Sequence, residues 1–199
     1  MDAAKTENLK STETQKETPK IDELKQSLDV ANSILTEYYN INKDIDYTGK
    51  RNTPKDYLDW VDKKTKIIMN SPKQKQFIDT LIKRGQVVWV EFGYNIGDEF
   101  SGRHPALVLK NGGRTLIVLP VTSKPPTERQ LQSKTYVELG TVYNFESMRR
   151  WINILNITNV SIQRVDTKKI RGAVKGSDMD KISKAFSEYG LFKYTPQNK

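Results

Sequence analysis

The chain has 199 residues, 36% hydrophobic and 29% charged, which is enough for one domain with an appendage or for two small domains. It contains no cysteine and one histidine, which excludes disulfides, thiolate metal sites and His-rich metal sites. No stretch approaches the roughly 18 apolar residues of a membrane span, and residues 1–20 lack the apolar segment of a signal peptide. We therefore expect a cytoplasmic protein.

The net charge of +9 is concentrated in the second part of the chain. Residues 1–83 hold 15 Lys and Arg against 14 Asp and Glu, whereas residues 84–199 hold 18 against 10. A basic domain attracts polyanions and accelerates its encounter with them. The charge alone does not separate a nucleic-acid binder from a small domain that is simply basic.

The first 82 residues divide into a polar tail and a helical segment. Residues 1–18 are rich in Lys, Thr, Glu and Gln and predict a disordered tail, because they cannot bury enough apolar surface to offset ordering. Between Ile21 and Tyr38, apolar residues recur at intervals of three and four, as in a heptad-like helical seam. The seam is short, so it fits dimerisation and packing on the chain's own domain equally well.

Two further helix starts follow. Thr53-Pro54 combines a capping hydroxyl with proline at the first helical position, and Ser71-Pro72 repeats the signal. Residues 19–82 are therefore predicted to form a helical extension of two or three helices.

At Arg84-Gly85 the hydrophobic period changes to the alternation of strands. A Gly-rich loop, Gly93–Gly102, and a turn at Asn111-Gly112-Gly113 separate the first candidates. The predicted strands are residues 88–92, His104–Lys110, Thr115–Thr122, Thr135–Leu139 and Asn156–Val165, and a helix capped by Ser177 runs to about Tyr189. Short strands closed by a helix predict a small barrel in the α+β class over residues 83–194.

The stretch Arg84–Lys124 resembles the MazF/PemK toxin family. The resemblance rests on Arg84-Gly85, Gly97-Asp98-Glu99, the GRHPALVL segment from Gly102, and Pro120-Val121-Thr122-Ser123. The segment 162–170, IQRVDTKKI, is similar to the family's strand exit, and the segment from Ser177 to Ile182 is similar to its closing helix. The likeness covers about residues 83–192, and residues 1–82 lie outside it.

The resemblance implies an SH3-like barrel that usually forms a homodimer. It also implies a toxin of a type II toxin–antitoxin system, an endoribonuclease that cuts single-stranded RNA at a short motif without a metal or other cofactor. The implied protein partner is a cognate antitoxin whose extended tail occupies the RNA groove.

Metal-free RNA cleavage uses the 2′-hydroxyl as an internal nucleophile, so the site must move two protons and stabilise a charged phosphorane. In the family this work rests on an Arg immediately before the Pro and on the Thr of the second strand. Thr122 matches that threonine, although a β-branched residue at this place also fits a plain strand end.

The first position departs from the family pattern. His104 precedes Pro105, and Arg103 lies one place earlier, where strand alternation points its side chain to the opposite face. One interpretation makes His104 a general acid or base, a role that suits imidazole better than guanidinium. The other is a weakened site that binds RNA without cutting it efficiently. The strand at Asn156–Ser161 also lacks the Arg and acidic residue of some relatives.

Other residues are candidates for contacting RNA. Glu99 could position Arg103 or His104, although a solvated loop charge fits equally well. Phe100 could stack on an unpaired base, as aromatic residues do in single-strand binders. The candidate backbone contacts are Lys110, Arg114, Ser123, Lys124 and Arg129.

Three hypotheses follow from the sequence. The leading one is an endoribonuclease toxin with its site between the Gly93–Gly102 loop, His104 and Thr122. The alternative is a catalytically weakened barrel that acts as a binding module for nucleic acid or protein. A third hypothesis concerns the extension, which would cover the groove in cis.

Overall fold

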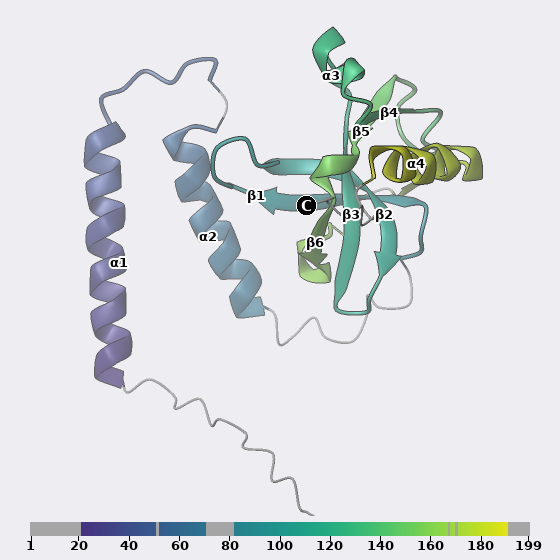
Figure 1. The fold of residues 1–199 in the computed structure, drawn as a ribbon. Coiled ribbons are helices and arrows are strands. Elements are labelled where there is room, and N and C mark those ends of the chain that lie inside the picture. Colours follow the sequence, from purple (N-terminus) through teal and green to yellow (C-terminus); the bar gives the residue numbers. More distant parts are fainter. Residues whose placement is uncertain (1–20, 51, 71–81, 167, 170, 191–199) are drawn as a thin grey trace, which may run out of the picture. The chain divides into compact units, whose positions relative to one another are not determined.

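The computed structural model describes residues 21–50, 52–70, 82–166, 168–169 and 171–190 (Figure 1). The chain divides into two compact units, Met1–Gly49 and Lys50–Lys199. This division differs from the sequence boundary at residue 82, because the second predicted helix belongs to the same unit as the sheet. The predicted tail 1–18 and the predicted helix after Ser71 lie outside the described residues.

The first unit contains helix α1 (Ile21–Asn42), which has no buried residue. The side chains of the predicted seam are largely exposed, at 85% for Ile21, 65% for Leu24 and 57% for Leu28. Neither α1 nor any other described helix is long and apolar enough to cross a membrane.

Helix α2 (Pro54–Asn70) opens the second unit and begins where the sequence predicts. The Thr53 hydroxyl accepts a hydrogen bond from the Asp56 amide at 3.3 Å, and the Asp56 carboxylate accepts one from the Thr53 amide at 2.8 Å. This reciprocal arrangement is a capping box, which satisfies amide groups that a helix start leaves without partners. Pro54 takes the first helical position, where it needs no amide hydrogen.

A curled antiparallel sheet forms the centre of the second unit, as a half-barrel. The strand order is β4-β5-β3-β2-β1-β7, and β6 pairs with β3. The strands are β1 (Gln86–Gly93), β2 (Gly102–Asn111), β3 (Thr115–Thr122), β4 (Tyr136–Leu139), β5 (Arg150–Asn153), β6 (Thr158–Ser161) and β7 (Gly172–Ala173). Together with the closing helix α4 (Gly176–Tyr189), this confirms the predicted α+β barrel class.

The core lies on both faces of the central strands, because their residues alternate between two apolar clusters. Val87 and Leu107 face a cluster that includes Ile182 and Ala185 of α4. Val88 and its neighbours face a second cluster, completed by Ile82, Val160, Ile162 and Val165. A sheet covered on both faces holds its strand ends in fixed register, and the candidate site lies at those ends.

The predicted strand Asn156–Val165 is wrong in extent. Only β6 is a strand there, between two 3-10 turns, η2 (Ile154–Asn156) and η3 (Ile162–Arg164). The Asn153 side chain accepts from the Leu155 amide at 3.1 Å, and the Ser161 hydroxyl accepts from the Gln163 amide at 3.3 Å. These local side-chain hydrogen bonds stabilise turns in place of a continuous ladder.

Four other elements differ from the prediction. The cap of α4 is Lys175, without a side-chain hydrogen bond, so Ser177 lies within the first turn. Strands β5 and β7 and the short helix α3 (Glu128–Gln132) were not predicted. Helix α3 starts with a capping box formed by Thr127 and Gln130.

Candidate functional site

A groove of about 970 Å³ lies where β1 ends, β2 begins and β3 ends. Seven of the residues singled out from the sequence line it, namely Glu99, Phe100, Arg103, His104, Thr122, Ser123 and Lys124. Residues of α2 and of the segment before it, including Asp56, Asp59 and Trp60, line it as well. The groove therefore combines the family-like motif with part of the extension.

His104 and Thr122 point to the same face of neighbouring strands. Ala106 of β2 pairs with Pro120 of β3. His104 lies two residues before Ala106 and Thr122 two residues after Pro120, so strand alternation places all four side chains on one face. Both candidate catalytic residues are half-buried on the wall of the groove.

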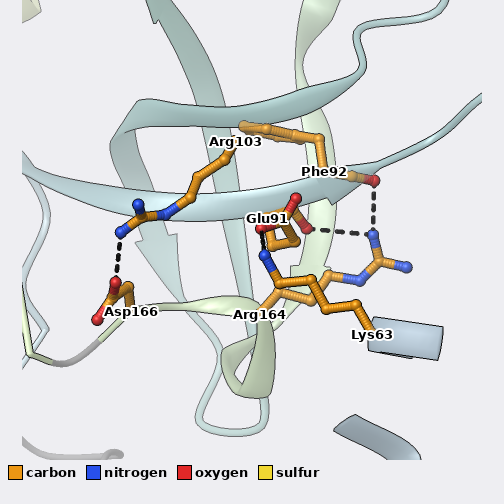
Figure 2. Close-up of polar contacts among 6 residues, drawn as sticks. All are labelled: Lys63, Glu91, Phe92, Arg103, Arg164 and Asp166. Atoms are coloured by element: carbon orange, nitrogen blue, oxygen red, sulfur yellow. Dashed lines mark hydrogen bonds and ion pairs between the residues drawn. The ribbon is translucent and has the colours of Figure 1, made fainter. Parts of the chain in front are cut away.

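Arg103 lies on the opposite face, as strand alternation predicts. Its guanidinium forms an ion pair with Asp166 (Figure 2). It also lies over the Trp89 ring, 5.2 Å from the ring centroid. The Asp166 amide donates to the Trp89 carbonyl at 2.9 Å, which fixes the carboxylate beside β1. Asp166 is thus the partner of Arg103.

Neither sheet irregularity moves Arg103 into the place of His104. One register shift lies between Glu91 and Gly93 of β1, and the other between Val108 and Lys110 of β2. The residue pairs Val90–His104 and Glu91–Arg103 remain regular. His104 and Arg103 therefore keep the opposite orientations that strand alternation predicts.

The Gly-rich loop uses its candidate residues for its own structure. The Glu99 carboxylate accepts from the Ile96 amide at 3.3 Å, and its described contacts include neither Arg103 nor His104. The Phe100 ring packs edge-on against His104, with 4.7 Å between ring centroids. Phe100 therefore packs against the imidazole on the groove wall.

At the end of β3, Thr122 is followed by two exposed residues, Ser123 and Lys124. The Thr122 hydroxyl oxygen accepts from the Lys124 amide at 3.0 Å. Because the oxygen accepts here, its own hydrogen is left to donate toward the groove. Lys124 places a positive charge on the same wall.

Lys110, Arg114 and Arg129 do not line the groove. Lys110 lies six residues along β2 from His104, which corresponds to about 20 Å in a strand. Arg114 lies at the hairpin that joins the same far ends of β2 and β3, and Arg129 lies on α3. These three residues looked close to the site only because the sequence does not show at which end of a strand the groove opens.

Helix α2 is attached to the end of β1 beside the groove. Lys63 forms an ion pair with Glu91, whose side chain is 13% exposed (Figure 2). The Trp60 ring lies against Gly93 and under the Arg164 guanidinium, 5.1 Å from the ring centroid. Arg164 also donates to the Phe92 carbonyl at 2.8 Å, so one arginine holds both the helix and the irregular end of β1.

Two further groove residues are not among those that the sequence predicts. Trp89 is half-buried on the groove wall and stacks on Phe145, with 6.0 Å between the ring centroids. Arg150 of β5 also lines the groove, although it is only 7% exposed. The available signal was its place directly before the apolar run Trp151-Ile152, which fits the first residue of a strand.

Comparisons with solved structures find MazF-type folds. An endoribonuclease from a mycobacterial species, solved with its cognate antitoxin, is 20% identical, covers 57% of this chain and 99% of its own, and has a TM-score of 0.40. A second mycobacterial endoribonuclease is 17% identical, with 60% and 100% coverage and a TM-score of 0.42. MazF from Deinococcus radiodurans is 19% identical, with 57% and 96% coverage and a TM-score of 0.41.

No curated protein matches the chain. A family model does, and its description is PemK-like, MazF-like toxin of type II toxin–antitoxin system. The match runs from residue 83 to residue 189, which is more than half of the chain and includes the groove residues of the sheet. The chain therefore belongs to the PemK-like, MazF-like toxin family.

Proposed function

We propose that this protein is an endoribonuclease toxin that cuts single-stranded RNA at a short motif without a metal ion. The observation that carries the proposal is the placement of His104 and Thr122 on one face of adjacent strands, within a groove that also holds Lys124. Family membership supports the same activity. The positive charge of residues 84–199 favours a polyanionic substrate.

The proposed reaction is an internal transfer at phosphorus. The 2′-oxygen forms a bond to the phosphorus, the bond to the 5′-oxygen breaks, and the products are a 2′,3′-cyclic phosphate and a 5′-hydroxyl. His104 exchanges the proton that leaves the 2′-hydroxyl or the one that reaches the 5′-oxygen. Thr122 donates its hydroxyl hydrogen to a phosphate oxygen, which stabilises the charge of the phosphorane.

The test is cleavage of a long single-stranded RNA in EDTA, with the ends mapped by sequencing. We expect cuts at a recurring short motif and 2′,3′-cyclic phosphate ends. His104→Ala should lower the rate by about 100-fold or more, the range of general acid–base catalysis. Thr122→Ala should also lower the cleavage rate. Its control is Thr115→Ala, at the opposite end of β3, which should leave the rate unchanged. A folded protein that leaves every RNA intact would contradict the proposal.

A binding module without efficient cleavage is the second candidate function. Two observations favour it: Asp166 neutralises Arg103, and β6 carries no charged residue. In this case the protein would retain RNA in a binding assay while the RNA stays whole over hours. Cleavage that is lost in both His104→Ala and Thr122→Ala would exclude it.

Membership in a type II family also supports proposals about partners. We propose that a cognate antitoxin occupies the groove, that the barrel forms a homodimer, and that the protein acts in the cytoplasm. Light scattering of the purified chain tests the dimer. Competition between RNA and a co-expressed antitoxin tests the shared groove.

A further inference from the structure

Arg150 is the buried cation of the groove. Its side chain is 7% exposed, and its Nε lies buried without a hydrogen-bond partner among the described residues. One terminal nitrogen donates to the Glu146 carbonyl at 3.2 Å, and the guanidinium lies over the Phe145 ring at 5.3 Å. A guanidinium has five N–H donors, so most of its hydrogen-bonding capacity is unused by these contacts.

The neighbouring arginine shows the contrast. Arg149 is exposed, and its guanidinium forms two hydrogen bonds with the Glu138 carboxylate, at 2.7 and 2.8 Å. Arg150 is the more buried of the two, yet it has no carboxylate partner among the described residues. A buried charge without a counterion is costly, so its retention on a groove wall indicates that an anion completes the site.

Arg150 and Arg103 lie at the two ends of a pair of stacked aromatic rings. Arg150 lies over the Phe145 ring, and Phe145 stacks on Trp89 with 6.0 Å between the ring centroids. Arg103 lies over the Trp89 ring. Two guanidinium groups are thus spaced by two aromatic rings along the sheet. Arg103 is already paired with Asp166, which leaves Arg150 as the arginine with capacity for a new anion.

We propose that Arg150 binds a backbone phosphate of the single-stranded RNA through terminal guanidinium N–H groups that its described contacts leave unused. Trp151, the next residue, pairs with Thr122 of β3, so the proposed phosphate subsite adjoins the strand end that carries the candidate catalytic threonine. Arginine is well suited to phosphate because its planar fork donates two parallel hydrogen bonds. The proposal rests on the proposed function, in which RNA occupies this groove.

The test measures binding of a 2′-O-methyl RNA, which lacks the nucleophilic hydroxyl and so separates binding from cleavage. Arg150→Gln should weaken binding by about tenfold or more, as expected for a lost charge-assisted hydrogen bond. The slope of log affinity against log salt should fall by about 0.7, the contribution of one phosphate on a single strand. Arg150→Lys keeps the charge but lacks the fork, and should recover only part of the affinity.

Arg149→Gln is the matched control, because it removes the same charge from the adjacent residue, which does not line the groove. A loss confined to Arg150→Gln supports the subsite. Equal losses in the two variants would show a general field effect and overturn it, as would unchanged binding by folded Arg150→Gln.

A second measurement needs no substitution. The Nε–Hε resonance of Arg150, assigned through its own side-chain carbons, should shift when the wild-type protein binds the 2′-O-methyl RNA. An unmoved Arg150 resonance, while amides of β2 and β3 respond, would overturn the proposal even if Arg150→Gln fails to fold. Cleavage of unmodified RNA is measured separately. If the protein does not cleave RNA but the Arg150 resonance shifts on binding, the proposed nuclease activity is refuted and the proposed phosphate subsite is supported.

Discussion

Replacing Gly93 by alanine should detach helix α2 from the end of β1. Gly93 has a φ of +89°, where an L-residue costs about 1–2 kcal/mol. An added Cβ would lie 2.4 Å from two carbons of the Trp60 ring, well inside ordinary contact distance. Trp60 is half-buried, so displacing it exposes about 100 Å² of apolar surface, worth about 2.5 kcal/mol as an upper estimate.

A double-mutant cycle separates these two terms. In the wild type, we expect Gly93→Ala to lower the free energy of unfolding by about 4 kcal/mol. In a Trp60→Ala background only the backbone strain remains, so the coupling energy between the two changes is about 2 kcal/mol. The assay is urea unfolding, supported by amide exchange of α2. Gly113→Ala is the control, because Gly113 has a similar φ of +86° with nothing within 4 Å of the added atom. Equal costs of Gly93→Ala in both backgrounds would refute the packing of Trp60 on Gly93.

Three other predictions concern the groove wall, the start of α2 and the core. Asp59→Asn should raise RNA affinity severalfold because Asp59 lines the groove, whereas Asp62→Asn, which does not, should leave it unchanged in the same titration. Hydrogen bonds from the Thr53 amide and hydroxyl lower the pKa of the Asp56 carboxyl below 3.8. The stabilisation of the helix start by this carboxylate is therefore present above pH 3.8 and is lost as the pH falls through the lowered pKa. Amide exchange of the first turn of α2 measures this loss. Thr53→Ala removes only the hydroxyl and should return part of that pKa shift in an NMR titration. Ile182→Ala should cost about 2–5 kcal/mol in urea unfolding, because the side chain is 1% exposed.

The hairpin of the site was predictable because its signals are local. Alternating apolar residues and the Asn111-Gly112-Gly113 turn predicted β3 at its observed bounds and β2 to within two residues at its start. The capping pattern of Thr53-Pro54 predicted the start of α2 for the same reason. The family motif then predicted that His104 and Thr122 belong to one site, and both line the groove.

The missed features depend on contacts between distant segments. Arg103 and Asp166 are 63 residues apart, and neither sequence neighbourhood indicates the other. Arg150 stands in an Arg-Arg pair, which normally predicts exposed side chains, and its burial follows only from the pairing of β5 with the end of β3. The contact of Trp60 with Gly93 is equally non-local, so neither sequence neighbourhood indicates it.

The turn between β2 and β3 lies at the opposite end of these strands from the groove. That hairpin sets the alignment of His104 with Thr122, whereas residues 94–101 and 123–135 connect strands at the open end. Insertions or deletions in these two connections would leave the pairing register of β2 with β3 unchanged. The loops around the groove can therefore change in length and sequence while the strands that carry His104 and Thr122 keep their alignment.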